Sequence, residues 1–208
     1  MPGITTERIR NIVVMGHTGS GKTSLTDAMF FTSGGDTRMG LVDQKNSRSD
    51  FAPEERERGM SINLSLLPSQ WKDHRINILD TPGYPDFRGE TVSSALVADL
   101  AIIVVSATSG IEVGTRQAWD LAEKMNLPRI IVVNKVDREN VDFNKVCADI
   151  ANIWGRECIP MVIPSSEGSK VDSVKNVFED ESLSDSSEYS VAVEAIAETD
   201  DDLILKYL

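Results

Sequence analysis

The sequence has little cysteine and no long apolar run. Of its 208 residues only two are cysteines, Cys147 and Cys158, and their spacing is not that of a CxxC pair. Two distant cysteines argue against a disulfide scaffold and favour free thiols in a reducing compartment. No apolar stretch approaches the roughly 18 residues that a membrane span needs, and the polar residues 1–10 do not form a signal peptide. We therefore expect a cytoplasmic protein with no membrane partner.

Basic side chains are also scarce. The chain has 33 Asp and Glu residues against 21 Lys and Arg residues, a formal net charge of −12. This charge repels phosphate backbones, so we expect no direct sequence-specific binding of nucleic acid by this chain. The acidic excess is uneven, because residues 168–208 contain 11 carboxylates and only 3 lysines. Apolar residues make up 40% of the sequence, which is enough for a folded core.

Short apolar segments alternate with longer helical patterns along the chain. This alternation predicts an α/β fold in which a mostly parallel, doubly wound sheet has helices on both faces. The segment 61–67 alternates, with Ile62, Leu64 and Leu66 on one side, as is typical of an edge strand. The predicted strands are residues 11–15, 61–67, 75–79, 101–105 and 129–133, and the predicted helices are residues 22–31, 89–99, 114–125 and 143–154.

Two regions depart from this alternation. Residues 32–59 are polar and much longer than an ordinary connection, which is typical of a functional or disordered loop. Later in the chain, residues 158–163 could form one more strand and residues 189–208 return to a helical pattern. We therefore expect a core domain in residues 1–163 and a separate acidic segment in residues 164–208.

A glycine-rich motif follows the first buried strand. Residues 16–23 (GHTGSGKT) match the pattern G-x-x-x-x-G-K-[ST]. Its glycines let the backbone N–H groups curl around phosphate oxygens at a helix N-terminus, which favours anions. Lys22 would reach the β- and γ-phosphates and the Thr23 hydroxyl would bind Mg²⁺. A turn with a solvated lysine is the alternative, and His17 is given no catalytic role. The phosphate-binding residues predicted here are Gly16, His17, Thr18, Gly19, Ser20, Gly21, Lys22, Thr23 and Ser24.

A second motif, Asp80-Thr81-Pro82-Gly83, ends the third predicted strand. A carboxylate at this position can hold Mg²⁺ directly or through water, and Gly83 can offer its N–H to a γ-phosphate oxygen. Loss of that phosphate would free the loop to move, which is how such proteins switch. In isolation the same residues would be a common turn, but the preceding phosphate loop favours the functional interpretation.

The third motif, Asn134-Lys135-Val136-Asp137, ends the fifth predicted strand. The Asp137 carboxylate can accept hydrogen bonds from the N1–H and the exocyclic amine of guanine, donors that adenine lacks on that edge. Adenine would leave the carboxylate unpaired and is therefore rejected. Asn134 would tie this loop to the phosphate loop, and the Lys135 stem can lie over the purine ring. A simple Asn/Asp turn is the alternative.

Three motifs in this order resemble those of the guanine-nucleotide-binding P-loop GTPases, and further residues resemble the translational GTPases. Residues 55–62 (ERERGMSI) resemble their first switch, usually written with R-G-I-T-I, and residues 80–87 (DTPGYPDF) resemble D-T-P-G-H-x-D-F. Over residues 9–163 the likeness is greatest to the elongation factor G family, especially its divergent elongation factor G-like members. The resemblance implies a P-loop NTPase fold, GTP or GDP with Mg²⁺ as ligands, and the ribosome as partner.

Two departures from the family pattern concern hydrolysis. Tyr84 stands where the family has the histidine that positions the attacking water, and a phenol with a pKa of about 10 accepts a proton poorly. Gly19 replaces an aspartate that many translational GTPases carry in the phosphate loop. The resemblance therefore implies slow intrinsic hydrolysis. It assigns Lys22, Ser61, Gly83 and Tyr84 to catalysis and Thr23, Ser61 and Asp80 to the metal.

Three functions stay open at this point. The chain could be a GTPase that hydrolyses GTP to GDP and phosphate on the ribosome, a binding module with little hydrolysis, or a ribosome-protection factor of the tetracycline-resistance type. The family also has a short Ser-Ala loop after its sixth strand, of which residues 164–166 could be a degenerate form. We favour instead an inserted subdomain in residues 164–208, with residues 194–208 as its helix and the sixth strand outside this chain. On that interpretation the chain is the amino-terminal piece of a longer protein.

Overall fold

The computed structural model describes residues 4–166 and 168–207. Its backbone divides into two compact units, Met1–Asn134 and Lys135–Leu208. The predicted boundary at residue 163 stays a prediction, because these units reflect the compactness of the backbone and not the extent of a functional domain. Within the described part of the chain, no helix has both the length and the apolar character to cross a membrane.

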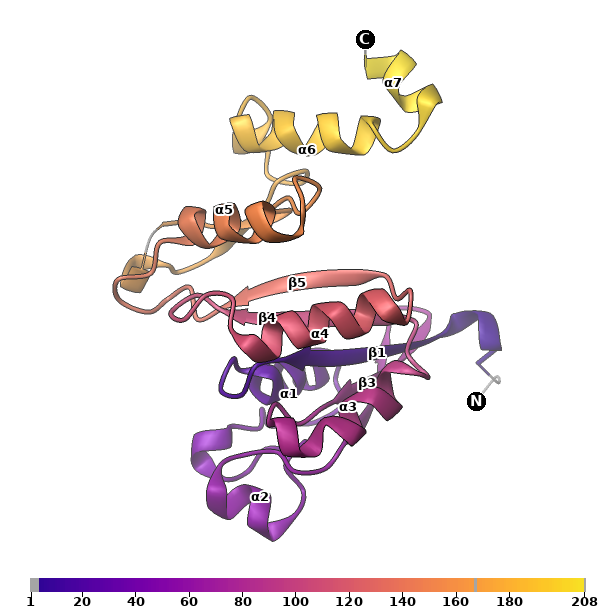
Figure 1. Ribbon diagram of the computed structural model, residues 1–208, viewed down its shortest axis with the longest axis vertical. Helices are drawn as coiled ribbons and strands as arrows, with labels where there is room; N and C mark the ends of the chain where they lie inside the picture. The colour runs from indigo at the N-terminus through magenta and orange to yellow at the C-terminus, as the bar shows by residue number, and fades with distance from the viewer. Residues whose placement is uncertain (1–3, 167, 208) are drawn as a thin grey trace. The chain divides into compact units, whose positions relative to one another are not determined.

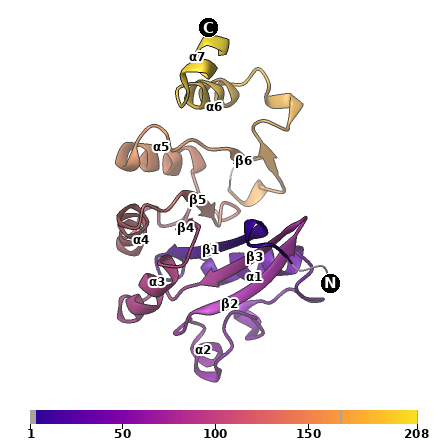
Figure 2. The same cartoon turned by 90° about the vertical axis from the view of Figure 1, so that its right-hand side faces the viewer.

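The first unit is built on a five-stranded sheet in the order β2-β3-β1-β4-β5, with β2 at one edge (Figure 2). Strands β1, β3, β4 and β5 are parallel, whereas β2 runs antiparallel to β3. The strands are β1 (Ile9–Gly16), β2 (Ser65–Trp71), β3 (His74–Asp80), β4 (Leu100–Ser106) and β5 (Arg129–Asn134). The helices are α1 (Lys22–Thr32), α2 (Pro53–Arg58), α3 (Arg88–Ala95) and α4 (Val113–Lys124). The predicted mostly parallel, doubly wound α/β fold is confirmed.

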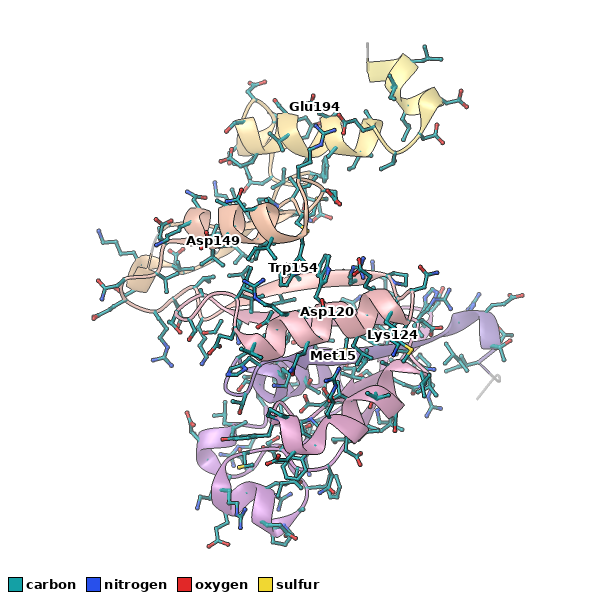
Figure 3. All side chains as sticks on the ribbon, in the orientation of Figure 1. Met15, Asp120, Lys124, Asp149, Trp154 and Glu194 are labelled. Carbon is teal, nitrogen blue, oxygen red and sulfur yellow. The ribbon has the colours of Figure 1, made fainter. Side chains whose placement is uncertain are left out.

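Both faces of the sheet are apolar because its central strands consist of β-branched runs. Met15 is fully buried on the face covered by α3 and α4, which lie in front of the sheet in Figure 1 and are drawn with side chains in Figure 3. The neighbouring Val14 points to the opposite face, where Leu25 and Met29 of α1 pack. Each fully buried side chain of this kind contributes about 1.5–3 kcal/mol relative to exposure. The two hydrophobic layers therefore fix the strands on which the predicted motifs stand.

The edge strand differs from its prediction. β2 begins at Ser65 and not at residue 61, and Leu66 is 57% exposed while Leu67 is buried. The antiparallel register pairs Leu67 with Ile78, so Leu67 faces the hydrophobic layer beneath α1. Leu66 lies on the other face of the strand and is exposed. Residues 61–63 are bound instead by side chains of the segment that precedes them, Asp50 and Glu55.

The predicted helix 89–99 is shorter in the structure. It ends at Ala95. The Asn11 side chain donates to the carbonyl of Val97 (2.9 Å), and the Asn11 backbone N–H donates to Asp99 Oδ2 (2.7 Å). These two bonds to β1 hold residues 96–99 in a turn, so a tertiary contact overrides the local helical pattern.

Over its described residues, the second unit contains three α-helices and a two-stranded sheet. Its elements are α5 (Phe143–Trp154), β6 (Val162–Pro164), β7 (Val174–Asn176), α6 (Ser187–Ala197) and α7 (Asp201–Tyr207). The side chain of Asp142 accepts from Lys145 N (2.9 Å) and caps α5, whose predicted bounds are confirmed. β6 pairs antiparallel with β7 in a sheet of their own. Of the predicted strand 158–163, only Val162 and Ile163 are extended.

The predicted helix 189–208 is two helices over the described residues. α6 starts earlier, at Ser187, because the Ser186 hydroxyl accepts from Tyr189 N (3.1 Å) as an N-cap. The chain then turns through residues 198–200, and Asp200 Oδ1 accepts from Asp202 N (2.8 Å) at the start of α7. The Asp200 cap at the start of α7 therefore interrupts the segment that the periodicity predicted as one helix. The last predicted helical residue, Leu208, lies outside the described residues.

Candidate nucleotide-binding site

The predicted phosphate loop lies between the end of β1 and the start of α1. Gly21 is the N-cap of α1 with φ +97°, and a Cβ atom there would overlap the side-chain amide of Asn134, so glycine is required. That amide donates to Ser20 O (3.0 Å), which is the predicted tie between the end of β5 and the loop. Among the described residues, the buried Ser20 Oγ has no hydrogen-bond partner. A loop of N–H groups at a helix N-terminus, with a spare hydroxyl, fits an anion.

His17 fastens the phosphate loop to the start of α4. Its Nδ1 accepts from Gly114 N (3.2 Å), and its Nε2 lies 3.4 Å from Glu112 Oε1. Both ring nitrogens are thus engaged with residues next to the loop. The geometry assigns His17 a bracing role, which agrees with the absence of a predicted catalytic role.

Lys22 lies at the centre of the loop. It is buried, and its Nζ donates to the carbonyl of His17 (2.9 Å). Burial lowers the pKa of the Lys22 ammonium to about 8, and the nearby Asp80 carboxylate partly offsets that effect. Gly83 packs against this group so closely that a Cβ atom would overlap Lys22 Nζ and lie 2.8 Å from Thr18 N. Lys22 and Gly83, which are far apart in sequence, therefore flank one small region beside the loop.

The three predicted metal-binding residues also converge. Thr23 Oγ1 lies 3.0 Å from Ser61 Oγ, and Asp80 at the end of β3 is buried. The Ser61 hydroxyl donates to Asp50 Oδ1 (2.7 Å), and the Ser49 hydroxyl donates to Asp80 Oδ2. In the described part of the chain, Asp80 Oδ1 has no hydrogen-bond partner. The structure thus gathers hydroxyl and carboxylate oxygens, the ligands that Mg²⁺ prefers.

The electrostatics of this cluster suit a cation. Burial raises the pKa of Asp80 to about 6, although hydrogen bonds from Ser49 and Thr23 and the charge of Lys22 lower it. Burial also raises the pKa of Asp50. Residues 4–166 and 168–207 contain no group of three or more His, Cys, Asp or Glu side chains that could hold a metal alone. The two carboxylates of the cluster, Asp50 and Asp80, fit Mg²⁺, which usually takes one or two carboxylates together with substrate phosphates.

The long polar segment 32–59 folds back onto the site. Glu55 on α2 is fully buried, with Oε2 accepting from Ala52 N (2.9 Å) and Oε1 accepting from Ile62 N (2.9 Å) and Asn63 N (2.8 Å). The Glu55 carboxylate therefore binds backbone N–H groups on both sides of the segment that carries Ser61, at Ala52 and at residues 62 and 63.

Sequence reasoning missed Ser49, Asp50 and Glu55 as parts of the site. They lie in segments rich in Ser and charged residues, and such segments normally face water. The only local signal was the resemblance of residues 55–62 to a switch motif. Burial of Glu55 depends on backbone groups at both ends of a tertiary loop, which no periodicity reports.

The two residues that depart from the family pattern occupy different places. Tyr84 follows Gly83 and is 39% exposed; it helps to line a cavity of about 40 Å³ whose walls include Gln117 and Leu121 of α4. Gly19 is exposed, with φ +71°. Any side chain at Gly19 would be strained in that conformation. The phenol of Tyr84 is thus next to the Gly83 loop and open to water.

The third motif crosses the boundary between the two units. Asn134 ends β5 in the first unit, while Lys135, with φ +63°, begins the second unit. Arg138 N donates to Lys135 O (3.2 Å) and closes a turn in which Asp137 is exposed. The role of Asp137 in reading a base stays a prediction.

Comparisons with known proteins agree with this site. A sequence profile of the family described as "Elongation factor Tu GTP binding domain" matches residues 7–199. Elongation factor G 2 of Borreliella afzelii (strain PKo) is 40% identical over 172 residues, 82% of this chain and 25% of that protein. The mitochondrial ribosome-releasing factor 2 of Drosophila yakuba is 38% identical over 177 residues, 85% of this chain and 25% of that protein. A crystal structure of a protein from Thermus thermophilus has a TM-score of 0.88 at 33% identity, covering 96% of this chain and 33% of that one.

The chain spans only a quarter to a third of the length of these relatives. The family profile nevertheless covers nearly all of the chain, including all three motifs. The predicted P-loop GTPase fold is confirmed by the sheet order and by the structural match. The chain belongs to the elongation factor G family of translational GTPases, in which it corresponds to the GTP-binding domain.

Proposed function

We propose that this chain binds GTP and GDP together with Mg²⁺, hydrolyses GTP to GDP and phosphate, and changes the conformation of its loops with the nucleotide. The observation that carries the proposal is the convergence of five residues beside the phosphate loop: Gly83 lies against Lys22, Thr23 lies against Ser61, and Asp80 is close enough to Lys22 and Thr23 for both to affect its pKa. These five residues come from three separate sequence segments. A buried ammonium, backbone N–H groups at a helix N-terminus and oxygen ligands are the combination that binds nucleotide phosphates with Mg²⁺.

In this proposal, positively charged and N–H groups bind the phosphates, and oxygen ligands bind the metal. Lys22 neutralises the β- and γ-phosphates, and the N–H groups of the loop and of Gly83 donate to phosphate oxygens. The Thr23 and Ser61 hydroxyls and the Asp80 carboxylate would hold Mg²⁺, which would supply positive charge to stabilise the transferred phosphate. Asp80 Oδ1, which has no hydrogen-bond partner among the described residues, supports this assignment, since a buried carboxylate oxygen without a donor is costly unless a cation pairs with it.

The switch would use the same contacts. The Ser61 hydroxyl contacts Thr23 of the phosphate loop, although Ser61 belongs to a separate segment. Within that segment it donates to Asp50, and the next residue, Ile62, donates to Glu55. With the γ-phosphate and Mg²⁺ bound, both Ser61 and Gly83 have partners in the site. After hydrolysis those partners are lost, and the segments around both residues are released.

Hydrolysis is the step on which two functions differ. An active enzyme needs a group that orients the attacking water, and Tyr84 is the residue beside Gly83 that can do so. Its phenol lacks the basicity of an imidazole, so the rate of hydrolysis is slow. The second candidate function is therefore a binding module that acts through its nucleotide state alone. The exposure of Tyr84 supports keeping this second candidate.

The ribosome as partner rests on the relatives, whose names include an elongation factor G and a ribosome-releasing factor. A cytoplasmic location is part of the same proposal. The net charge of −12 supports the proposal that this chain itself makes no sequence-specific contact with nucleic acid.

Single-turnover hydrolysis of radiolabelled GTP, with and without ribosomes, tests the enzymatic proposal. We expect slow release of phosphate by the wild-type chain and a faster rate for Tyr84→His. A matched Tyr189→His variant, which changes a tyrosine in the second unit, should leave the rate unchanged. Tight binding of GTP with a background rate under every condition would leave only the binding module. An unchanged rate in Tyr84→His would show that the missing histidine is not the limitation.

A further inference from the structure

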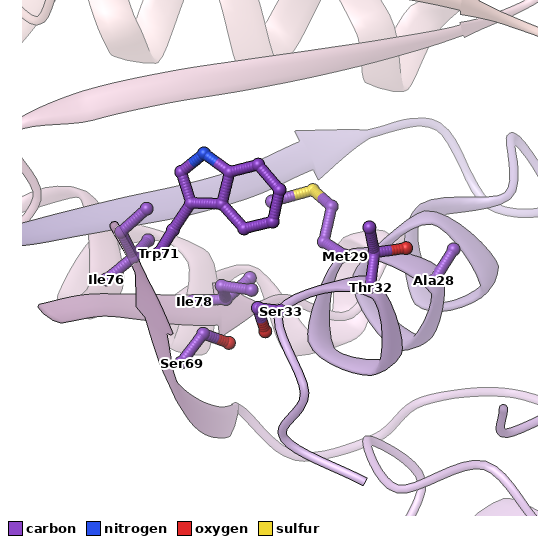
Figure 4. Close-up of a pocket in the computed structure, with 8 residues that line it drawn as sticks. All are labelled: Ala28, Met29, Thr32, Ser33, Ser69, Trp71, Ile76 and Ile78. Atoms are coloured by element: carbon purple, nitrogen blue, oxygen red, sulfur yellow. The ribbon is translucent and has the colours of Figure 1, made fainter. Parts of the chain in front are cut away.

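A second pocket opens in the first unit between the C-terminal half of α1 and the hairpin of β2 and β3 (Figure 4). Its volume is about 320 Å³, which lies within the range of small-molecule sites. None of its lining residues belongs to the candidate nucleotide site. They are Ala28, Met29, Thr32, Ser33, Ser69, Trp71, Ile76 and Ile78.

Ser69 brings a buried hydroxyl to this pocket. Ser69 is only 5% exposed, and within the described residues its Oγ makes no hydrogen bond. The nearby Ser33 hydroxyl does not compensate, because it donates to the carbonyl of Phe30 (2.8 Å). A buried hydroxyl left in this state bears the desolvation penalty of an unmade hydrogen bond. In Figure 4 the Ser69 side chain points into the space between β2 and α1, where a bound molecule could pair with it.

The other walls are apolar and include an aromatic face. Trp71 is 48% exposed at the end of the edge strand, and its indole extends toward Met29 of α1 (Figure 4). Ile76 and Ile78 of β3 form the floor on the same face of the sheet as Ser69, in the register Ser69↔Ile76. The pocket is lined by no charged side chain among the described residues. A charged ligand would lose its hydration there without compensation, so the ligand is neutral.

We propose that this pocket binds a small neutral aromatic compound, whose ring stacks on Trp71 and whose single hydroxyl or carbonyl group pairs with Ser69 Oγ. The ligand is a free molecule, because the pocket matches small-molecule sites in size and its one unsatisfied group is buried at its wall. The site goes beyond nucleotide binding and does not depend on it. It lies beside the C-terminal half of α1, which begins at Lys22, and beside the middle of β3, which ends at Asp80.

The experiment uses two probes that differ by one hydroxyl group, 2-naphthol and naphthalene. Each is titrated into the full isotope-labelled chain, and amide chemical shifts in two-dimensional NMR report both the place and the affinity of binding. We expect saturable shifts at the pocket residues, with 2-naphthol binding more tightly than naphthalene. No shift at these residues up to saturation of the solution with 2-naphthol would overturn the proposal.

Variants of Ser69 and Trp71 separate the contribution of the hydrogen bond from that of the aromatic stacking. Ser69→Ala should weaken 2-naphthol by about fivefold, the value of one hydrogen bond, and leave naphthalene unchanged. Trp71→Ala should weaken both probes by about tenfold. The matched control is Ser93→Ala on the exposed surface of α3, which should alter neither affinity. Equal losses for both probes in Ser69→Ala would contradict the role of its hydroxyl.

A third probe tests the choice of a free molecule. N-acetyl-tyrosinamide carries the same aromatic hydroxyl chemistry on a peptide unit. Weaker binding than 2-naphthol at the same amides supports a free ligand. Tighter binding would overturn that choice in favour of an aromatic side chain from a partner protein.

Discussion

Replacement of Glu55 by alanine should release the turn that holds Ser61. The Glu55 carboxylate accepts from the backbone N–H groups of Ala52, Ile62 and Asn63 at 2.8–2.9 Å and from Asn63 Nδ2 at 3.2 Å. Alanine leaves all four donors without an acceptor in a place that is fully buried. The turn must then either bury unpaired N–H groups or open to water.

The size of the effect follows from those bonds. A hydrogen bond to a charged group contributes about 1.5–3 kcal/mol, and an unpaired buried donor costs a similar amount. Opening lets water replace the lost acceptor, so the local loss should be about 3 kcal/mol and not the full sum of the bonds. A loss of about 3 kcal/mol corresponds to an increase of about 150-fold in local opening. The global unfolding temperature should change much less, because the two hydrophobic layers of the sheet are untouched.

Hydrogen exchange measured by mass spectrometry over residues 52–64 tests this prediction. Glu55→Ala should exchange about two orders of magnitude faster there than wild type, and its affinity for GTP with Mg²⁺ should fall because Ser61 is no longer held. Glu54→Ala is the matched control, since it removes the same charge from an exposed position on the same helix. Equal exchange in the two variants would refute the assignment of Glu55 as the group that closes the turn.

Three further predictions concern titration and backbone shape. In metal-free protein, the Asp80 pKa of about 6 means that the folded state keeps a proton that the unfolded chain releases near pH 4. The unfolding free energy should therefore fall by up to about 3 kcal/mol between about pH 4 and 6, and Asp80→Asn should flatten that profile in chemical denaturation. Burial raises the pKa of Cys147 to about 11, so at about pH 8 its thiol should react with a disulfide reagent about 100-fold more slowly than free cysteine; equal rates would contradict its burial. Gly21→Ala should displace Asn134 and weaken GTP binding at least about tenfold by calorimetry, whereas Gly34→Ala, which has a similar positive φ and open space, should not.

The parts of the site that could be predicted from the sequence are those that one short segment specifies. The residues from Gly16 to Thr23 follow a buried strand directly, and their glycines are needed by the local backbone. Asp80 could be placed for the same reason, because it ends a strand whose carboxyl end lies beside that of β1. Parallel strands bring their ends to one edge of the sheet, so local motifs there become neighbours.

The missed features depend on contacts between distant segments. Ser49 donates to Asp80 across 31 residues, and Glu55 is buried against backbone N–H groups of Ala52 and of residues 62 and 63, outside its own short helix. The buried face of β2 is set by its pairing with β3, which the apolar alternation of residues 61–67 does not report. The pocket beside Ser69 likewise exists only because α1 and the hairpin leave space between them. Periodicity records which face of an element is apolar, but not which polar groups another element brings to it.

Base selectivity tests the central claim most directly. Binding of GTP, ATP and xanthosine triphosphate should be measured by calorimetry on the wild-type chain and on Asp137→Asn. We predict that the wild type prefers GTP over ATP by on the order of 10⁴-fold, because adenine leaves the carboxylate unpaired. We predict that Asp137→Asn prefers the xanthine nucleotide, whose O2 can accept from the new amide. Equal binding of ATP and GTP by the wild type, or a continued preference for GTP in Asp137→Asn, would contradict the account.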